Sequence, residues 1–314
     1  MALAQDGLHA PVVVPARDDS AANRHTILWL ALWMTGSLLS FSIAAVSVRA
    51  LAKSLSAFEI MSIRSASGLL FLTLLAVLRP ELRRTLATRR MGLHALRNSI
   101  HFGAQISWTL AVTWLPLATV FALEFTMPAW VALLAVAMLG ERLTVSRIGS
   151  IVLCFAGVLL IVRPGHGDFR PEVLIALAAA VAMAITLTIT KKLTATESTF
   201  AILFWMNLMQ LPMNLAGSDP TFVLKLEVSM ALPAAGIAIA GLSTHYCLTN
   251  AFRHGDASVV MPLDFLRVPF IAFVGWSLYG EAVRSWVFAG AALIIGGLFW
   301  NLRAEALRVP PPSP

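Results

Sequence analysis

Five charged residues lie inside long apolar stretches of this 314-residue sequence: Arg64, Arg97, Glu124, Asp264 and Arg267. A charged side chain inside a lipid bilayer is costly, so each of them needs a partner or a task. The carboxylates of Glu124 and Asp264 could take turns in binding an ammonium group or a proton. Alternatively, they could pair with arginines and hold helices together, as Asp264 and Arg267 can at helical positions i and i+3.

Arg64 has no charged counterpart in the second half of the chain, because alignment of the two halves matches it to Met206. An unmatched arginine near mid-membrane could clamp a substrate carboxylate. It could instead neutralise Glu59 or Glu124. Arg97 lies closer to a helix end, where a long side chain can reach the cytoplasmic surface.

Aromatic side chains are a second group of candidates for substrate binding. His101, His245 and Tyr246 lie within expected helices. Each could hydrogen-bond a substrate, relay a proton or bond a neighbouring helix. Three tryptophans near helix centres could stack against an aromatic or apolar substrate or simply fill the interior: Trp108, Trp130 and Trp205.

Prolines interrupt the two segments that carry the carboxylates, at Pro128, Pro262 and Pro269. A proline removes a backbone hydrogen bond and kinks a helix. Carbonyl groups freed in this way can face a cavity but not lipid. We therefore expect these two segments to form both a binding wall and a moving gate.

Several classes of function leave no trace in the sequence. No H-E-x-x-H, G-x-S-x-G or Walker pattern is present, and no histidine or carboxylate lies four residues after His101 or His245. We therefore expect no metal, no cofactor and no enzyme activity. An ion channel would place polar side chains in a ring at one depth, whereas here they are scattered.

The composition indicates a membrane protein. Hydrophobic residues make up 58% of the chain and charged residues 12%, and the mean hydropathy is +0.80. The net charge of +7 comes from basic residues placed between apolar runs, which is typical of orientation signals rather than nucleic-acid binding. Their distribution predicts that both termini are cytoplasmic.

Ten segments approach the roughly 20 residues that a spanning helix needs. They are 27–48, 58–78, 94–114, 117–139, 146–162, 172–190, 198–216, 230–252, 257–279 and 284–303. Between and around them we expect disordered cytoplasmic tails at 1–26 and 304–314 and a linker at 164–171, which leaves five-helix units at 27–163 and 172–303. The predicted fold class is an all-α integral membrane protein.

The two units are copies of each other. A constant shift along the chain matches Leu123-Glu124-Phe125 to Leu263-Asp264-Phe265, Gly140-Glu141 to Gly280-Glu281, and Gly157 to Gly297. Because each unit has an odd number of spans, the second must enter the membrane from the opposite side. The sequence therefore predicts inverted repeats, a design of transporters. Glycines in the fifth and tenth spans predict close helix packing, as scaffold or as a homo-oligomer contact.

The motifs resemble the EamA-type repeats of the drug/metabolite transporter superfamily. The resemblance rests on Leu-Gly-Glu-Arg-Leu-Thr at 139–144, on Gly149, Gly157 and Pro128, and on Tyr279-Gly280-Glu281, and it covers residues 27–303. It implies ten helices in two inverted repeats around a central cavity and export of small metabolites. The pattern is most similar to the bacterial amino-acid exporter branch. The second copy departs from it at Ala282 and at Pro269, which lies one place off the match to Pro128.

We therefore expect a secondary transporter in the bacterial inner membrane that exports small metabolites, foremost amino acids, by alternating access. The alternatives are a facilitator or exporter of another compound (a nucleobase, a sugar or a cationic drug), an ion channel or an intramembrane enzyme. The expected partners are a small-molecule substrate and the lipid bilayer, with no nucleic acid.

Overall fold

The computed structural model describes residues 19–127, 129–131, 133–134, 145–163, 170–194, 196–254, 267–282 and 284–306. Regular structure in these ranges is helical. The ten longer helices are α1 (Asp19–Leu51), α2 (Ala57–Leu78), α4 (Met91–Trp114), α5 (Leu117–Glu124), α7 (Val145–Val162), α8 (Val173–Thr194), α9 (Thr199–Ala216), α10 (Ala231–His254), α12 (Arg267–Tyr279) and α13 (Ser285–Ala306). Short helices α3 (Pro80–Arg84), η1 (Phe222–Lys225) and η2 (Val228–Met230) lie in connections.

Most helix bounds lie within a few residues of the spans expected from hydropathy, but α5 ends at Glu124, well before residue 139, and α1 begins before residue 27. It begins at Asp19, so residues 19–26 are helical although they were expected to belong to a disordered tail. This stretch includes Ala21 and Ala22, and alanine has the highest helix propensity. The apolar count alone therefore placed the start of the helix too late.

The predicted break near Pro128 is visible as the end of α5. The helix stops at Glu124, whose carbonyl would accept a hydrogen bond from residue 128 in a continuous helix. A proline there has no N–H to donate, so the helix loses this bond. In the second half, Pro269 lies within α12 (Arg267–Tyr279), near the point where the described residues resume. Pro128 and Pro262 lie outside the described residues.

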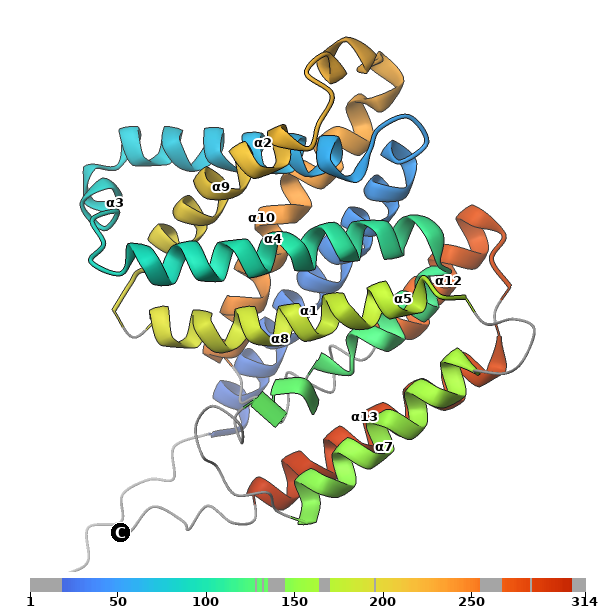
Figure 1. The fold of residues 1–314 in the computed structure, drawn as a ribbon. Coiled ribbons are helices and arrows are strands. Elements are labelled where there is room, and N and C mark those ends of the chain that lie inside the picture. Colours follow the sequence, from blue (N-terminus) through green and yellow to red (C-terminus); the bar gives the residue numbers. More distant parts are fainter. Residues whose placement is uncertain are drawn as a thin grey trace, which may run out of the picture.

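The longer helices pack in pairs, and each main pair joins a helix of residues 19–162 to one of residues 173–306. α1 packs on α10, α2 on α9, α4 on α8, α5 on α12 and α7 on α13 (Figure 1). The five helices of the first part correspond, in chain order, to the five of the second part. When every helix is replaced by its counterpart, the list of pairs stays the same. Such a contact pattern is expected of a duplicated unit packed against its copy.

The α7–α13 pair depends on glycine. A Cβ atom added to Gly157 would lie 2.5 Å from the carbonyl oxygen of Gly290, and one added to Gly290 would lie 2.6 Å from the carbonyl oxygen of Gly157. The two backbones therefore approach more closely than any side chain would allow. This confirms the expected close packing of the fifth and tenth spans.

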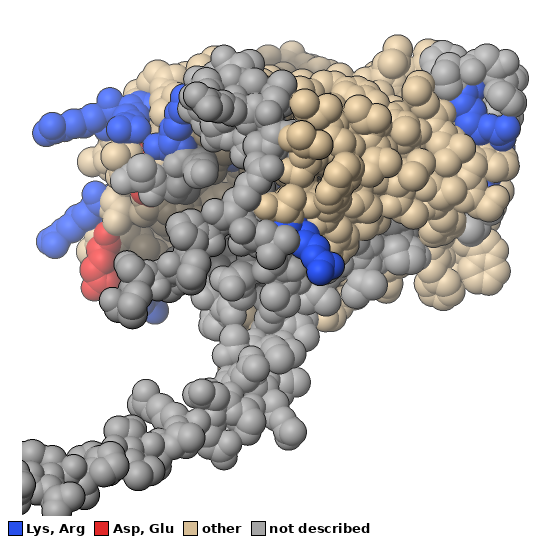
Figure 2. Space-filling model, turned by 90° about the horizontal axis from the view of Figure 1, so that it is seen from below, with Lys and Arg blue, Asp and Glu red and all other residues tan. Residues whose placement is uncertain are grey.

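Apolar side chains face outward along several helices. On α7 they form one stripe at helical spacing: Val145, Ile148, Val152, Phe155 and Leu159. Among the described residues, three helical segments are long and apolar enough to cross a membrane: Leu32–Leu51, Ala57–Leu78 and Val173–Thr190. In Figure 2 most of the coloured surface carries no charge, and its Lys and Arg gather mainly toward two ends. A wide apolar surface of this kind requires lipid contact.

Candidate functional site

A small pocket lies between α4, α5 and α8. It is lined by Ala104, Trp108, Val120, Glu124, Ala176, Ala179, Ala180 and Met183, and it has room for about one water molecule. The alanines of α8 leave this space, and Glu124 and Trp108 bring polar atoms to it. Two residues expected to bind substrate, Glu124 and Trp108, therefore do lie together.

Glu124 is held by an arginine of the second half. Nη1 of Arg267 lies 3.8 Å from Oε1 of Glu124, and both side chains are largely buried. The guanidinium also lies 4.2 Å from the ring centroid of Phe41, and the Phe41 ring meets the Trp108 ring edge-on at 5.6 Å. A buried cation gains from both contacts. The structure thus realises the pairing alternative for Glu124, whereas Asp264 lies outside the described residues.

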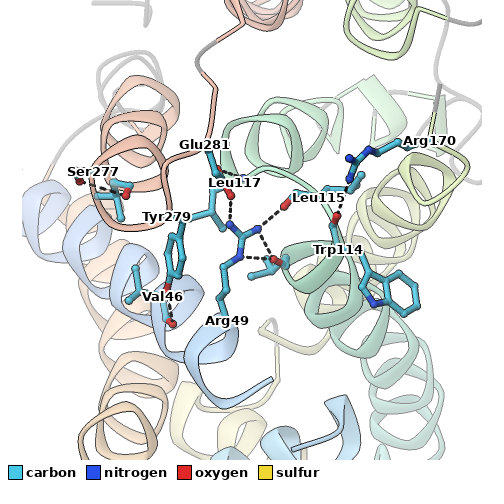
Figure 3. A network of polar contacts seen from close by, with 11 residues as sticks. Val46, Arg49, Trp114, Leu115, Leu117, Arg170, Ser277, Tyr279 and Glu281 are labelled. Carbon is cyan, nitrogen blue, oxygen red and sulfur yellow. Dashed lines mark hydrogen bonds and ion pairs between the residues drawn. The ribbon is translucent and has the colours of Figure 1, made fainter. Parts of the chain in front are cut away.

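A second polar centre joins both halves where α4 ends and α5 begins (Figure 3). Arg49 of α1 is ion-paired with Glu281. Arg49 also donates to the carbonyl oxygens of Val112 (2.6 Å from Nη2) and Leu115 at the end of α4. Glu281 accepts the N–H of Leu117, the first residue of α5, at 2.9 Å. Cation and carboxylate thus each occupy the helix end that the backbone dipole favours. We call this cluster the Arg49–Glu281 latch.

Gly280 turns the chain so that Glu281 reaches the latch. Its φ of +64° lies in the left-handed region, which only glycine adopts without strain. The N–H of Gly280 donates to the carbonyl of Trp276 at 3.0 Å, and this bond ends α12. Tyr279 stacks on Arg49 at 5.0 Å and donates from its hydroxyl to the carbonyl of Val46. The Gly-Glu motif of the second copy therefore ends a helix and supplies the carboxylate of an ion pair.

Arg64 does not neutralise either of the acids proposed for it from the sequence. Glu59 caps α2 together with Ser56 and binds Lys225 at 3.0 Å. Glu124 pairs with Arg267. Arg64 itself is buried, and its Nη1 has no hydrogen-bond partner among the described residues.

Arg97 was expected to reach the membrane surface, and this expectation is wrong. Its side chain is buried and donates from Nε to Oγ1 of Thr190 at 3.2 Å and from Nη1 to Oδ1 of Asn98 at 2.8 Å. Because α8 packs along α4, this arginine faces a neighbouring helix instead of the headgroups.

A buried polar row on α9 was missed in the sequence. Asn207, Gln210 and Asn214 lie at spacing i, i+3 and i+7, and all three are buried. Gln210 contacts Nδ1 of His101 at 2.8 Å, which shows that His101 bonds a neighbouring helix. Asn214 donates to the hydroxyl of Ser65 on α2 at 3.1 Å. The helical spacing of three amides in an apolar segment was the available signal.

Other predicted site residues lie away from the pocket. Trp205 donates to the carbonyl of Leu86 and fixes a connection. Trp130 donates to Oγ1 of Thr126 and packs edge-on against Phe155 of α7. Tyr246 is 63% exposed. The side chains of His245 and Pro269 are outside the described set. In the described part of the chain, no three His, Cys, Asp or Glu residues could hold a metal ion.

A bundle of paired apolar helices whose described charges lie mainly in its interior and at its ends defines a multi-pass membrane protein. The chain belongs to the EamA-like transporter family, whose model matches residues 28–163 and again 170–303. It is therefore a transporter and not an enzyme. The two matches also agree with the internal repeat.

Curated relatives are similar over most of their length. A riboflavin transporter of Brucella anthropi is 29% identical over 71% of this chain and 80% of its own. An S-adenosylmethionine uptake transporter of Rickettsia prowazekii is 26% identical over 87% of this chain and 92% of its own. A pseudopaline exporter of Pseudomonas aeruginosa is 27% identical over 82% and 89%, respectively. The expected likeness to amino-acid exporters gains no support from these three.

A solved crystal structure shares the fold. It covers 90% of this chain and 99% of its own with a TM-score of 0.57 at 18% identity. At that identity the likeness concerns the fold alone.

Proposed function

We propose that this protein is a secondary transporter that carries a small metabolite across the bacterial inner membrane by alternating access between two inverted halves. The observation that carries the proposal is the Glu124–Arg267 pair beside the pocket. It joins α5 to α12, which belong to the two spans, 117–139 and 257–279, that alignment of the two halves matches. An ion pair between symmetry-matched helices is well placed to break and re-form when the halves rock.

The Arg49–Glu281 latch supports a state closed at one end. It ties α1 and α4 of the first half to the turn after α12 of the second. With both termini in the cytoplasm, this end of the bundle is the outer one. The nearly filled pocket agrees with such a closed state. We propose that opening to the outside requires the latch to separate.

The cargo we propose is a small metabolite with a flat ring, rather than an amino acid as such. Two of the relatives carry riboflavin and S-adenosylmethionine, and both molecules contain a planar heterocycle. Trp108 and Phe41 offer aromatic surface next to Glu124 in the interior. Aromatic side chains stack well on such rings. Asp264 and the proline segments at Pro128, Pro262 and Pro269 remain our candidates for the second acid and the moving parts.

Counterflow in proteoliposomes tests this proposal. The purified protein is loaded with unlabelled riboflavin, S-adenosylmethionine or tryptophan, and uptake of the labelled compound is followed. We expect saturable counterflow of riboflavin or S-adenosylmethionine that Glu124→Gln lowers at least tenfold and that Glu227→Gln in an exposed connection does not change. Non-saturable flux or ohmic current would overturn the carrier mechanism, and saturable counterflow of tryptophan alone would restore the amino-acid hypothesis.

A further inference from the structure

Two arginines in the interior lack an acidic partner among the described residues. Arg64 on α2 is 9% exposed and Arg97 on α4 is 5% exposed. Arg97 donates to the neutral Thr190 and Asn98 side chains, and Nη1 of Arg64 donates to nothing in the described part of the chain. The two positive charges are close enough to repel each other. Within the described ranges, this pair therefore carries an uncompensated double charge.

The two acids proposed as partners of Arg64 each have another cation. Glu59 is bound by Lys225, and Glu124 lies beside Arg267. A buried charge that lacks a counterion is strongly destabilising. Two buried arginines that lack an acidic partner in the described part of the chain are suited to receive an anion.

The surroundings of the pair are built to receive a polar group. His94 lies one helical turn before Arg97 on α4, is fully buried, and neither of its ring nitrogens has a hydrogen-bond partner among the described residues. The stem of Arg64 lies against Gly241 of α10, where an added Cβ would come within 2.8 Å of Nε. Glycine at this position therefore leaves the space that the guanidinium needs.

Arg97 also lies along the α4–α8 seam that lines the pocket. Ala104 and Met183 line the pocket, and they are seven residues from Arg97 and Thr190 respectively. Seven residues are about two turns, roughly 10 Å. One elongated molecule can therefore reach from the pocket to the arginines.

We propose that Arg64 and Arg97 bind an oxyanion, a carboxylate or a phosphate, on the transported metabolite while its ring lies near Trp108. This inference rests on the proposed transport function and narrows its substrate class. Guanidinium groups suit the role because they bind oxyanions through two parallel hydrogen bonds. His94 supplies a third donor. The neutral half of the cargo and its acidic end then contact different helices, so both must be present for full affinity.

Matched ligand pairs test the proposal on the full-length protein. Riboflavin is compared with riboflavin 5′-phosphate, and adenosine with adenosine 5′-phosphate, so that the second member of each pair adds only a phosphate. Binding is read as thermal stabilisation and as inhibition of counterflow. We expect the acidic member of at least one pair to bind tenfold or more tightly, and Arg64→Gln and Arg97→Gln to abolish that preference. Arg303→Gln, which removes an exposed charge from α13, should leave it unchanged.

Simple anions provide a readout that does not depend on transport. At equal ionic strength, phosphate or acetate should raise the melting temperature above its value in chloride, and the one that does so identifies the preferred oxyanion. Arg64→Gln should remove this increase and raise the melting temperature in chloride, because it deletes an unpaired charge. If Arg64→Gln does not fold, Gly241→Ala, which displaces the guanidinium, serves in its place.

The outcomes separate the two proposals. Stabilisation by an oxyanion that requires Arg64, without flux of any compound, keeps the anion site and rejects the transport of these metabolites. The opposite outcome is saturable riboflavin flux that Arg64→Gln does not change, together with equal binding of the neutral and acidic members of each pair. That result would support transport and overturn the anion site.

Discussion

Glu281 is ion-paired with Arg49 across 232 positions of sequence, and each also binds backbone groups at the junction of α4 and α5. The pair is therefore a link between the two halves and a cap for two helix ends at once. Removing either side chain leaves a charge and at least one backbone group without a partner.

Glu281→Gln should open this end of the bundle. The amide can still accept the N–H of Leu117 but cannot neutralise Arg49. Losing one partner of a fully buried pair costs about 3–5 kcal/mol, and partial exposure here reduces that to about 1–3 kcal/mol. Ala118, which lines a small pocket beside Glu281, is replaced by cysteine in a background without Cys154 and Cys247. Its maleimide reactivity should rise several-fold with Glu281→Gln, while Glu227→Gln should have no effect; equal rates would contradict the latch.

The inverted repeat predicts a matching latch at the other end. Alignment of the two halves sets Glu281 on Glu141 and Arg49 on Lys191. Glu141→Gln should therefore favour opening to the cytoplasm and lower the reactivity of the same cysteine at Ala118. If both substitutions change the reactivity in the same direction, the halves do not alternate.

Gly290→Ala should separate α7 from α13. The new Cβ would lie 2.6 Å from a backbone oxygen that cannot turn away, and such overpacking costs about 1–3 kcal/mol. Gly296→Ala on the same helix is the control, because nothing lies within 4 Å of its added Cβ. There the higher helix propensity of alanine stabilises by up to about 1 kcal/mol. The melting temperature in detergent should therefore fall for Gly290→Ala and rise for Gly296→Ala. A loss of stability in both variants would show that the close contact at Gly290 is not what lowers the stability.

Asp219 gives the connection between α9 and α10 a pH dependence. The Lys225 ammonium and the Thr221 N–H hold the pKa of this carboxyl below its usual range. A lowered folded-state pKa stabilises the connection above the unfolded pKa of about 4, and this contribution is lost as the pH falls through the folded value. Asp219→Asn should therefore speed amide exchange in residues 219–226 more at pH 7 than at pH 2. The same acceleration at both values would point to a cause other than charge.

The sequence predicts features that depend on neighbouring residues better than contacts between residues far apart in the chain. Hydropathy located most helices, Pro128 predicted an interruption of the span 117–139, and glycines predicted close packing of α7 and α13, since each depends on local chemistry. The partner of Glu281 could not be found in this way. Any of several arginines could have paired with it, and only the packing of α1 selects Arg49.

The interior arginines show the same limit. Arg64 was recognised as unmatched, but the loss of its expected partners appears only when Lys225 is seen beside Glu59 and Arg267 beside Glu124. Arg97 was assigned to the surface because position along a helix says nothing about the face that it presents. Trp205 and Tyr246 were candidates for substrate binding on the same basis, and they lie away from the pocket.

The inverted arrangement of the halves is the claim on which the transport mechanism depends, and labelling of its two equivalent turns tests it most directly. Arg142→Cys and Arg284→Cys are made separately in the cysteine-free background and treated in intact cells with an impermeant maleimide. The account predicts that Arg284→Cys reacts from outside and that Arg142→Cys reacts only after the membrane is opened. Labelling of both cysteines from the same side would contradict it.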